Sequence, residues 1–171
     1  MNILKKTLTS ALLLTATTTL INAGSPTFEQ NGVKEGNNKL SIGLYTSVPD
    51  EGDESISLNA QYGHFFSDDV EGILDVYTKI QDGETLYMLS PGANYYFAKT
   101  PTLTPYVGAQ VYYFDGTYDG MDSTTGHKMY VGAHKFLNEN AAITPELGTR
   151  FFEFTEYTET YLNIYLSYFF D

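Results

Sequence analysis

Apolar and polar residues alternate with a period of two along most of this chain. The last segment shows the pattern most clearly, because Leu162, Ile164, Leu166, Tyr168 and Phe170 all fall on one parity. This period is typical of β-strands whose two faces meet different surroundings. Eight such segments follow one another, at 38–48, 55–66, 70–81, 84–97, 104–114, 126–137, 141–152 and 161–171.

The connections between these segments alternate in length and character. Those at 67–69, 98–103 and 138–140 are compact, whereas those at 49–54, 82–83, 115–125 and 153–160 are longer or more acidic. No stretch with a helical period of 3.6 interrupts the series. The pattern therefore predicts an antiparallel up-and-down meander, with compact turns at one end and more acidic loops at the other.

The polar parity indicates which face of the sheet points inward. It carries Ser, Asn, Gln and Tyr, together with Gly43, Gly63, Gly92, Gly108, Gly132 and Gly148. Small residues suit the crowded interior of a narrow barrel, whereas a face in water normally carries many Lys and Glu residues. The sequence therefore predicts an all-β fold, an eight-stranded antiparallel up-and-down transmembrane β-barrel with its apolar face toward lipid. A soluble lipocalin-like barrel, with the apolar face inward, is the alternative.

Composition and charge narrow the class of protein. The chain has 171 residues, enough for one domain, and a formal charge of -12 that argues against binding nucleic acid. It contains no Cys, which excludes disulfide bonds and Cys-ligated metal sites. Only 18% of its residues are charged, and most of those lie outside the eight segments.

The N-terminal region differs from the rest. Lys5 and Lys6 precede an apolar stretch around residues 12–14, and Ala23 provides a small residue for cleavage, as in a secretory signal peptide. The predicted organisation is a signal peptide at 1–23, a flexible periplasmic lead-in at 24–37 and an outer-membrane β-barrel at 38–171.

Four segments resemble the small eight-stranded outer-membrane β-barrel proteins of Gram-negative bacteria: residues 63–76, 91–97, 104–114 and 161–170. The resemblance implies an outer-membrane location among lipids that include lipopolysaccharide. It also implies recognition by the barrel-assembly machinery, which in this family reads a terminal aromatic residue preceded by alternating apolar ones. Phe170, with Tyr168, Leu166 and Ile164, matches that signal, although Asp171 follows where the family usually ends. We expect a monomer.

Several charged residues fall on the inward parity and form a candidate lumen charge network. They are Glu71, Asp75, Lys79, Lys128, Glu146 and Arg150, with His134 as an expected hydrogen-bonding partner. Charges in a narrow barrel must be paired, so the structural interpretation is a salt-bridge plug. The functional alternative is a gated ion path. We expect Arg150 to pair with Glu146 or with a carboxylate on a neighbouring strand.

The sequence gives little support for catalysis or metal binding. Lipid A deacylases on this fold carry a His-x-Ser pair, and His64, His127 and His134 each lack it. The acidic connections, in which we include Glu159, do not match an EF-hand. We expect solvated loops, with divalent cations bridging them to lipopolysaccharide phosphates as the alternative. No enzyme activity, cofactor or bound metal is predicted.

Aromatic residues at the strand ends suit the interfacial girdles of a membrane barrel. We assign to these girdles Tyr45, Phe66, Phe97, Tyr113, Phe114, Phe151, Tyr168 and Phe169. The predicted function is a non-enzymatic structural or surface-interaction role in the cell envelope. The alternatives are a narrow or gated channel for small solutes or ions, a soluble periplasmic lipocalin-like carrier, and an enzyme that acts on lipid.

Overall fold

The computed structural model describes residues 31–48, 55–81, 84–116, 124–152 and 158–171. All eight predicted strands are present in it, with boundaries that differ from the predicted ones by at most three residues. They are β1 (Asn38–Val48), β2 (Ser55–Ser67), β3 (Val70–Gln81), β4 (Glu84–Tyr96), β5 (Leu103–Gly116), β6 (Thr124–Phe136), β7 (Ala141–Phe152) and β8 (Thr158–Phe170).

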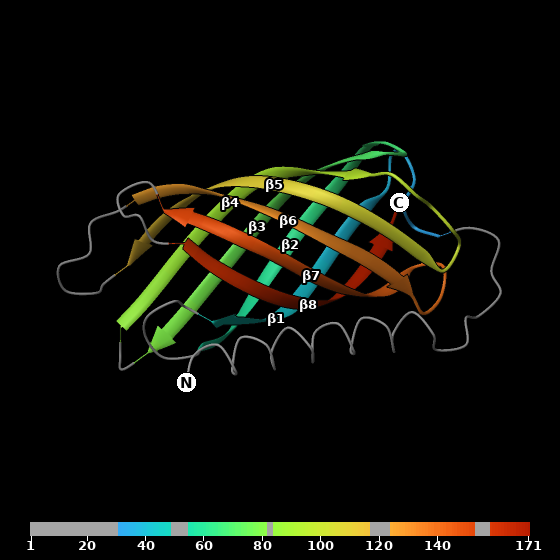
Figure 1. The fold of residues 1–171 in the computed structure, drawn as a ribbon. Coiled ribbons are helices and arrows are strands. Elements are labelled where there is room, and N and C mark those ends of the chain that lie inside the picture. Colours follow the sequence, from blue (N-terminus) through green and yellow to red (C-terminus); the bar gives the residue numbers. More distant parts are fainter. Residues whose placement is uncertain (1–30, 49–54, 82–83, 117–123, 153–157) are drawn as a thin grey trace, which may run out of the picture.

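The strands form a closed barrel in chain order, and every neighbouring pair is antiparallel (Figure 1). Closure comes from the ladder between β1 and β8, which runs from Asn38 opposite Phe170 to Val48 opposite Thr160. The predicted all-β up-and-down barrel is therefore confirmed. Closure gives each of the eight described strands a partner on both edges, which is the condition for placing a sheet in lipid.

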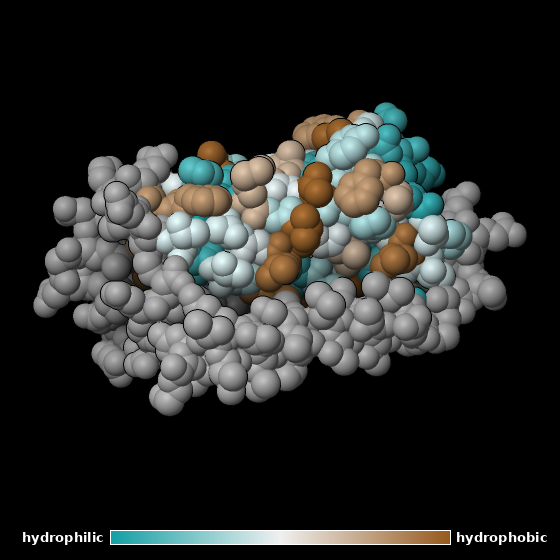
Figure 2. Space-filling model, viewed as in Figure 1, coloured by the Kyte–Doolittle hydropathy of each residue, from teal (hydrophilic) through white to brown (hydrophobic). Residues whose placement is uncertain are grey.

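The two faces of the wall differ as the alternation predicts. On β8, the side chain of Leu166 is 62% exposed on the outside, whereas its neighbour Ser167 is fully buried inside. Apolar side chains lie across the middle of the face seen in Figure 2, and hydrophilic ones gather toward the end where the C-terminus lies. A soluble lipocalin-like carrier would have the opposite arrangement, so the structure does not fit that alternative. Among the described residues, no helix is long and apolar enough to cross a membrane.

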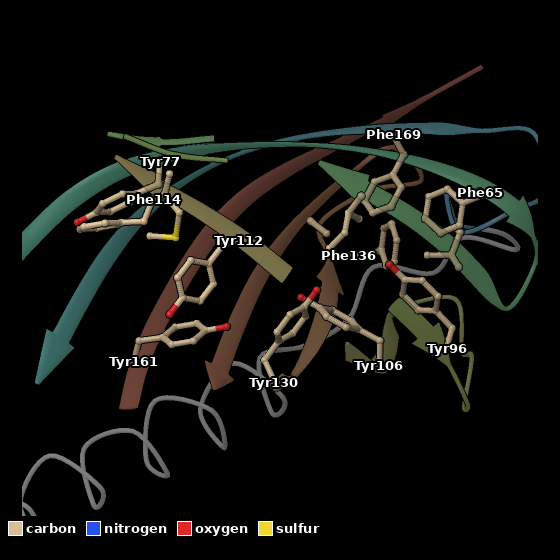
Figure 3. Packing of buried hydrophobic residues seen from close by; sticks show 14 of the residues in the cluster. Phe65, Tyr77, Tyr96, Tyr106, Tyr112, Phe114, Tyr130, Phe136, Tyr161 and Phe169 are labelled. Carbon is tan, nitrogen blue, oxygen red and sulfur yellow. The ribbon is translucent and has the colours of Figure 1, made fainter. Parts of the chain in front are cut away.

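The buried aromatic side chains point into the space that the strands enclose (Figure 3). One group lies near the short turns and contains Phe65, Tyr96, Phe136 and Phe169. A second group lies toward the opposite end and contains Tyr77, Tyr112 and Phe114. The core of this protein is therefore the barrel interior, and any site within it is formed by inward-facing residues.

Candidate functional site

The candidate lumen residues come from three strands, β3, β6 and β7, and share the inward parity. Glu71, Asp75, Lys128, His134, Glu146 and Arg150 all lie in the interior, and none is more than 5% exposed. The side chain of Lys79 lies outside the described part of the structure. The remaining six residues form three connected groups at successive levels of the barrel.

The first group surrounds Glu71 near the short turns. Lys39 Nζ lies 2.7 Å from one carboxylate oxygen of Glu71 and donates a 2.9 Å hydrogen bond to the other. The Asn94 amide and the Tyr96 hydroxyl also donate to Glu71 Oε2, at 2.7 and 2.6 Å. Lys39 was not among the predicted residues, although its position on the inward parity of β1 could have revealed it. A buried carboxylate with this many donors is well compensated.

A chain of hydrogen bonds links this group to the opposite wall. Tyr96 donates to Glu71, so the 3.0 Å contact between Tyr96 OH and His134 Nε2 requires the proton on Nε2. His134 Nδ1 then accepts from the Thr144 hydroxyl at 2.7 Å. Thr144 contacts the hydroxyl of Ser167 at 3.0 Å, and Ser167 contacts that of Ser41 at 2.8 Å. This assignment gives His134 both of its partners as a neutral ring.

The second group occupies the middle of the barrel. Lys128 on β6 pairs with Asp75 on β3 at 2.7 Å, which joins two strands that are not neighbours in the wall. Glu146 accepts hydrogen bonds from the hydroxyls of Tyr106 and Tyr161, each at 3.2 Å. Among the described side chains, Glu146 forms no ion pair within 4.0 Å, unlike the other three buried carboxylates.

The third group lies toward the longer loops. Arg150 on β7 pairs at 2.7 Å with Glu159, which lies directly opposite it on β8. The expected partner on a neighbouring strand is therefore the one observed, rather than Glu146. Glu159 was wrongly assigned to an acidic loop, because β8 begins three residues earlier than the alternation indicated. The Arg150 guanidinium also stacks within 6 Å of the rings of Tyr112 and Tyr161.

Glycines make room for the tyrosines between these groups. Five inward glycines each lie directly opposite an inward tyrosine on the next strand: Gly43 and Tyr165, Gly108 and Tyr130, Gly126 and Tyr112, Gly132 and Tyr106, and Gly148 and Tyr161. In every pair, a Cβ atom on the glycine would overlap the tyrosine side chain. The tyrosine side chains therefore pack directly against the glycine backbone. We call these five positions, where a glycine without a Cβ atom leaves room for an aromatic side chain, the glycine seats.

The girdle assignment is only partly correct. Phe66, Phe97, Tyr113 and Tyr168 are exposed on the outer wall. Phe114 and Phe169, in contrast, are buried in the interior and belong to the two aromatic groups there. Each of the two follows an aromatic residue of the opposite parity, so their aromatic character alone could not reveal their direction. The side chain of Tyr45 lies outside the described part.

The four residues proposed as an assembly signal share one face of the last strand. Ile164, Leu166, Tyr168 and Phe170 all point outward, with exposed fractions between 38% and 62%. Their strand is also the one that closes the barrel against β1. The structure thus presents them together on the outer wall.

Nothing in the described part of the chain forms a metal centre. No group of three or more His, Asp and Glu side chains there could hold a metal ion. His64 contacts the side chain of Asn38 at 3.0 Å, and His127 stacks on Phe151. Of the acidic connections, 49–54, 82–83, 117–123 and 153–157 lie outside the described residues, so the prediction of cation bridges to lipopolysaccharide falls there.

An apolar outer wall around a closed, internally paired polar interior defines a membrane-spanning β-barrel. Several solved structures of small outer-membrane barrels are similar to this one. The N-terminal β-barrel domain of Pseudomonas aeruginosa OprF matches 80% of this chain and all of its own, with a TM-score of 0.62 and 22% identity. Ail, the attachment invasion locus protein of Yersinia pestis, matches 80% of this chain and 99% of its own, with a TM-score of 0.56 and 14% identity.

Neisserial surface protein A is similar over 77% of this chain and 95% of its own, with a TM-score of 0.54 and 15% identity. Neither a protein-family model nor a curated protein sequence matches the chain. The fold of this protein is therefore that of the small eight-stranded outer-membrane β-barrels, as the sequence resemblance indicated. The likeness supports the predicted outer-membrane localisation.

Proposed function

We propose that this protein is a non-enzymatic outer-membrane barrel with a structural or surface-interaction role in the cell envelope, and that its interior is filled by its own side chains. The observation that carries the proposal is the pairing inside the barrel. Three buried ion pairs, Lys39–Glu71, Lys128–Asp75 and Arg150–Glu159, lie at successive levels between tyrosine rings. Eight strands enclose a space just wide enough for such side chains.

The surroundings of His134 support a role without catalysis. His134 is fully buried and uses both ring nitrogens in hydrogen bonds, so it has no free nitrogen to act as a general base. The surface-contact part of the proposal agrees with the names of two structurally similar proteins, an attachment invasion locus protein and a surface protein.

The proposed partners are the membrane and the machinery that builds it. The outward apolar side chains of every strand suit a band of outer-membrane lipid, including lipopolysaccharide on the outer side. The outward face of β8 suits recognition by the barrel-assembly machinery. We propose a monomer, because the β1–β8 ladder completes the sheet within one chain.

Planar-bilayer recording tests the filled interior. The purified, folded protein is expected to produce no stable conductance steps. A Tyr96→Ala/Tyr106→Ala double variant removes two fully buried rings and is expected to conduct, which serves as the control for detection. Reproducible conductance steps from the unmodified protein would contradict the filled interior and favour the narrow-channel alternative.

A further inference from the structure

The described chain begins with a segment that lies outside the strands but is bound to the barrel. We call residues 31–37 the strap. Its first residue, Asn31, donates from its side-chain amide to the carbonyl of Thr100 at 2.8 Å and to the hydroxyl of Thr104 at 3.1 Å. Thr104 lies on β5, and Thr100 lies in the turn that precedes it. The strap is thus tied to the β5 side of the barrel.

The other end of the strap is fixed to the β1 side. The amide of Gly36 donates to the carbonyl of Phe65, and the amide of Phe65 donates to the carbonyl of Asn37, both at 2.9 Å. These bonds extend the β1–β2 ladder backward past Asn38. The turn that makes this possible is closed by Asn37 N to Lys34 O and uses Gly36 at a φ of 86°, a conformation that favours glycine.

The two attachment points face each other across the barrel. In the closed order of eight strands, β5 is four strands from β1 in either direction. Both attachments lie at the end of the barrel with the short turns, where the blue start of the described chain and the C-terminus are seen in Figure 1. The strap therefore spans the mouth of the barrel at that end.

The middle of the strap is packed onto the aromatic group beneath it. Val33 is only 6% exposed and belongs to the same buried cluster as Phe65, Phe136 and Phe169. Gly32 lies so close to the ring of Phe169 that a Cβ atom there would overlap it. The carbonyl of Gly32 also accepts from the side chain of Asn37 at 3.2 Å, and the backbone amide of Val33 donates to the side-chain oxygen of Asn31 at 3.0 Å.

We propose that the strap is a cap by which the chain's own N-terminal segment closes the barrel on the short-turn side and ties β5 to the opposite wall. This goes beyond the filled interior, because it assigns closure of one mouth to a segment that could be displaced without breaking any strand. Because the sequence predicts that the lead-in at 24–37 lies in the periplasm, and the strap is part of that lead-in, this mouth would face the periplasm. The cap would separate the Lys39–Glu71 group and His134 from periplasmic water.

Thiol protection tests the cap directly, because the chain contains no cysteine of its own. A single Val33→Cys variant is folded in detergent and treated with a bulky, membrane-impermeant maleimide. Its matched control is Glu35→Cys, which lies two residues away on the same strap but is exposed. Protection of the buried position by local closure should slow labelling at residue 33 at least ~10-fold relative to residue 35. Heating in SDS should abolish the difference.

A third variant tests whether the hydrogen bonds from Asn31 to Thr100 and Thr104 hold the cap in place. Adding Asn31→Ala to Val33→Cys removes both bonds to the β5 side, together with the bond that Asn31 accepts from the amide of residue 33, and should raise the labelling rate toward that of Glu35→Cys. Equal labelling of residues 33 and 35 in the folded, heat-modifiable protein would overturn the cap. So would slow labelling that Asn31→Ala leaves unchanged, because closure would then not depend on the tie to β5. Neither result would affect the conductance test of the filled interior.

Discussion

Each buried carboxylate in this barrel has a different set of partners, and the consequences of removing its charge should differ accordingly. Glu71 faces Lys39, which is 1% exposed and would be left as an uncompensated charge by Glu71→Gln. We expect that substitution to destabilise the barrel by about 3–5 kcal/mol. The measurement is the urea concentration at the midpoint of unfolding in lipid vesicles. Unfolding is monitored by SDS gels of unboiled samples, in which the band of the folded barrel disappears.

Glu146 provides the matched comparison for Glu71. Its contacts are the hydroxyls of Tyr106 and Tyr161, and a glutamine amide oxygen can accept from the same donors. Glu146→Gln should therefore change the unfolding free energy by less than about 1 kcal/mol, or raise it, because burying an unpaired charge is costly. Equal losses for the two variants would contradict the pairing described for the interior.

A side chain added at one of the glycine seats should destabilise the barrel. Gly132→Ala places a methyl group where the Tyr106 ring lies, and overpacking of this kind costs about 1–3 kcal/mol. Ala93→Val adds bulk on the outward face of β4, where the side chain meets lipid, and should cost little. The unfolding midpoints of the two variants are compared with that of the unmodified protein. If Ala93→Val were as damaging as Gly132→Ala, crowding inside the barrel would not be the cause.

At the scale of elements, two neighbouring residues of the last strand allow an effect on assembly to be distinguished from an effect on packing. Phe170 points outward, whereas its neighbour Phe169 is fully buried against Phe65 and Phe136. We expect Phe170→Ala to reduce the amount of folded protein in the outer membrane while leaving its unfolding temperature nearly unchanged. Phe169→Ala should lower that temperature, with a loss of about 3–5 kcal/mol, because it leaves a cavity.

Both variants are measured by cell fractionation and by heating unboiled samples stepwise before electrophoresis. A Phe170→Ala barrel that accumulates normally would remove the support for this residue as an assembly signal. A Phe169→Ala barrel of unchanged thermal stability would contradict its place in the interior.

The strands themselves were predictable because a period of two is a local property. Every strand was predicted to within three residues, and Glu71, Asp75, Lys128 and Arg150 were assigned to the inward face by parity alone. The residues with which they pair could not be predicted in the same way. The Lys128–Asp75 pair joins strands that are not neighbours, which depends on the stagger of the closed barrel.

Other features were missed because the local pattern was ambiguous. Glu159 follows a run of acidic and polar residues that masks the start of β8. Phe114 and Phe169 each lie beside an aromatic residue of the other face, so hydrophobicity did not reveal their direction. The strap is polar and has no period, and its position is set by hydrogen bonds to Phe65, Thr100 and Thr104 rather than by a sequence pattern.

At the scale of the whole molecule, three properties act together: an apolar outer wall, a closed ladder from β1 to β8, and an interior held by buried ion pairs. Lipid favours the first two, since it can satisfy no free backbone group. The third supports the proposal that the interior is a packed core rather than a channel. Together they predict a barrel that stays closed in SDS at room temperature and unfolds only on heating.

The most direct test of this central claim is heat-modifiability of protein taken from the outer-membrane fraction. Samples extracted in mild detergent are run on SDS gels, boiled and unboiled. We expect the protein in that fraction, and we expect its unboiled form to migrate differently from its boiled form, because the closed barrel resists SDS until it is heated. Recovery in the soluble periplasmic fraction, with identical mobility before and after boiling, would contradict the membrane barrel.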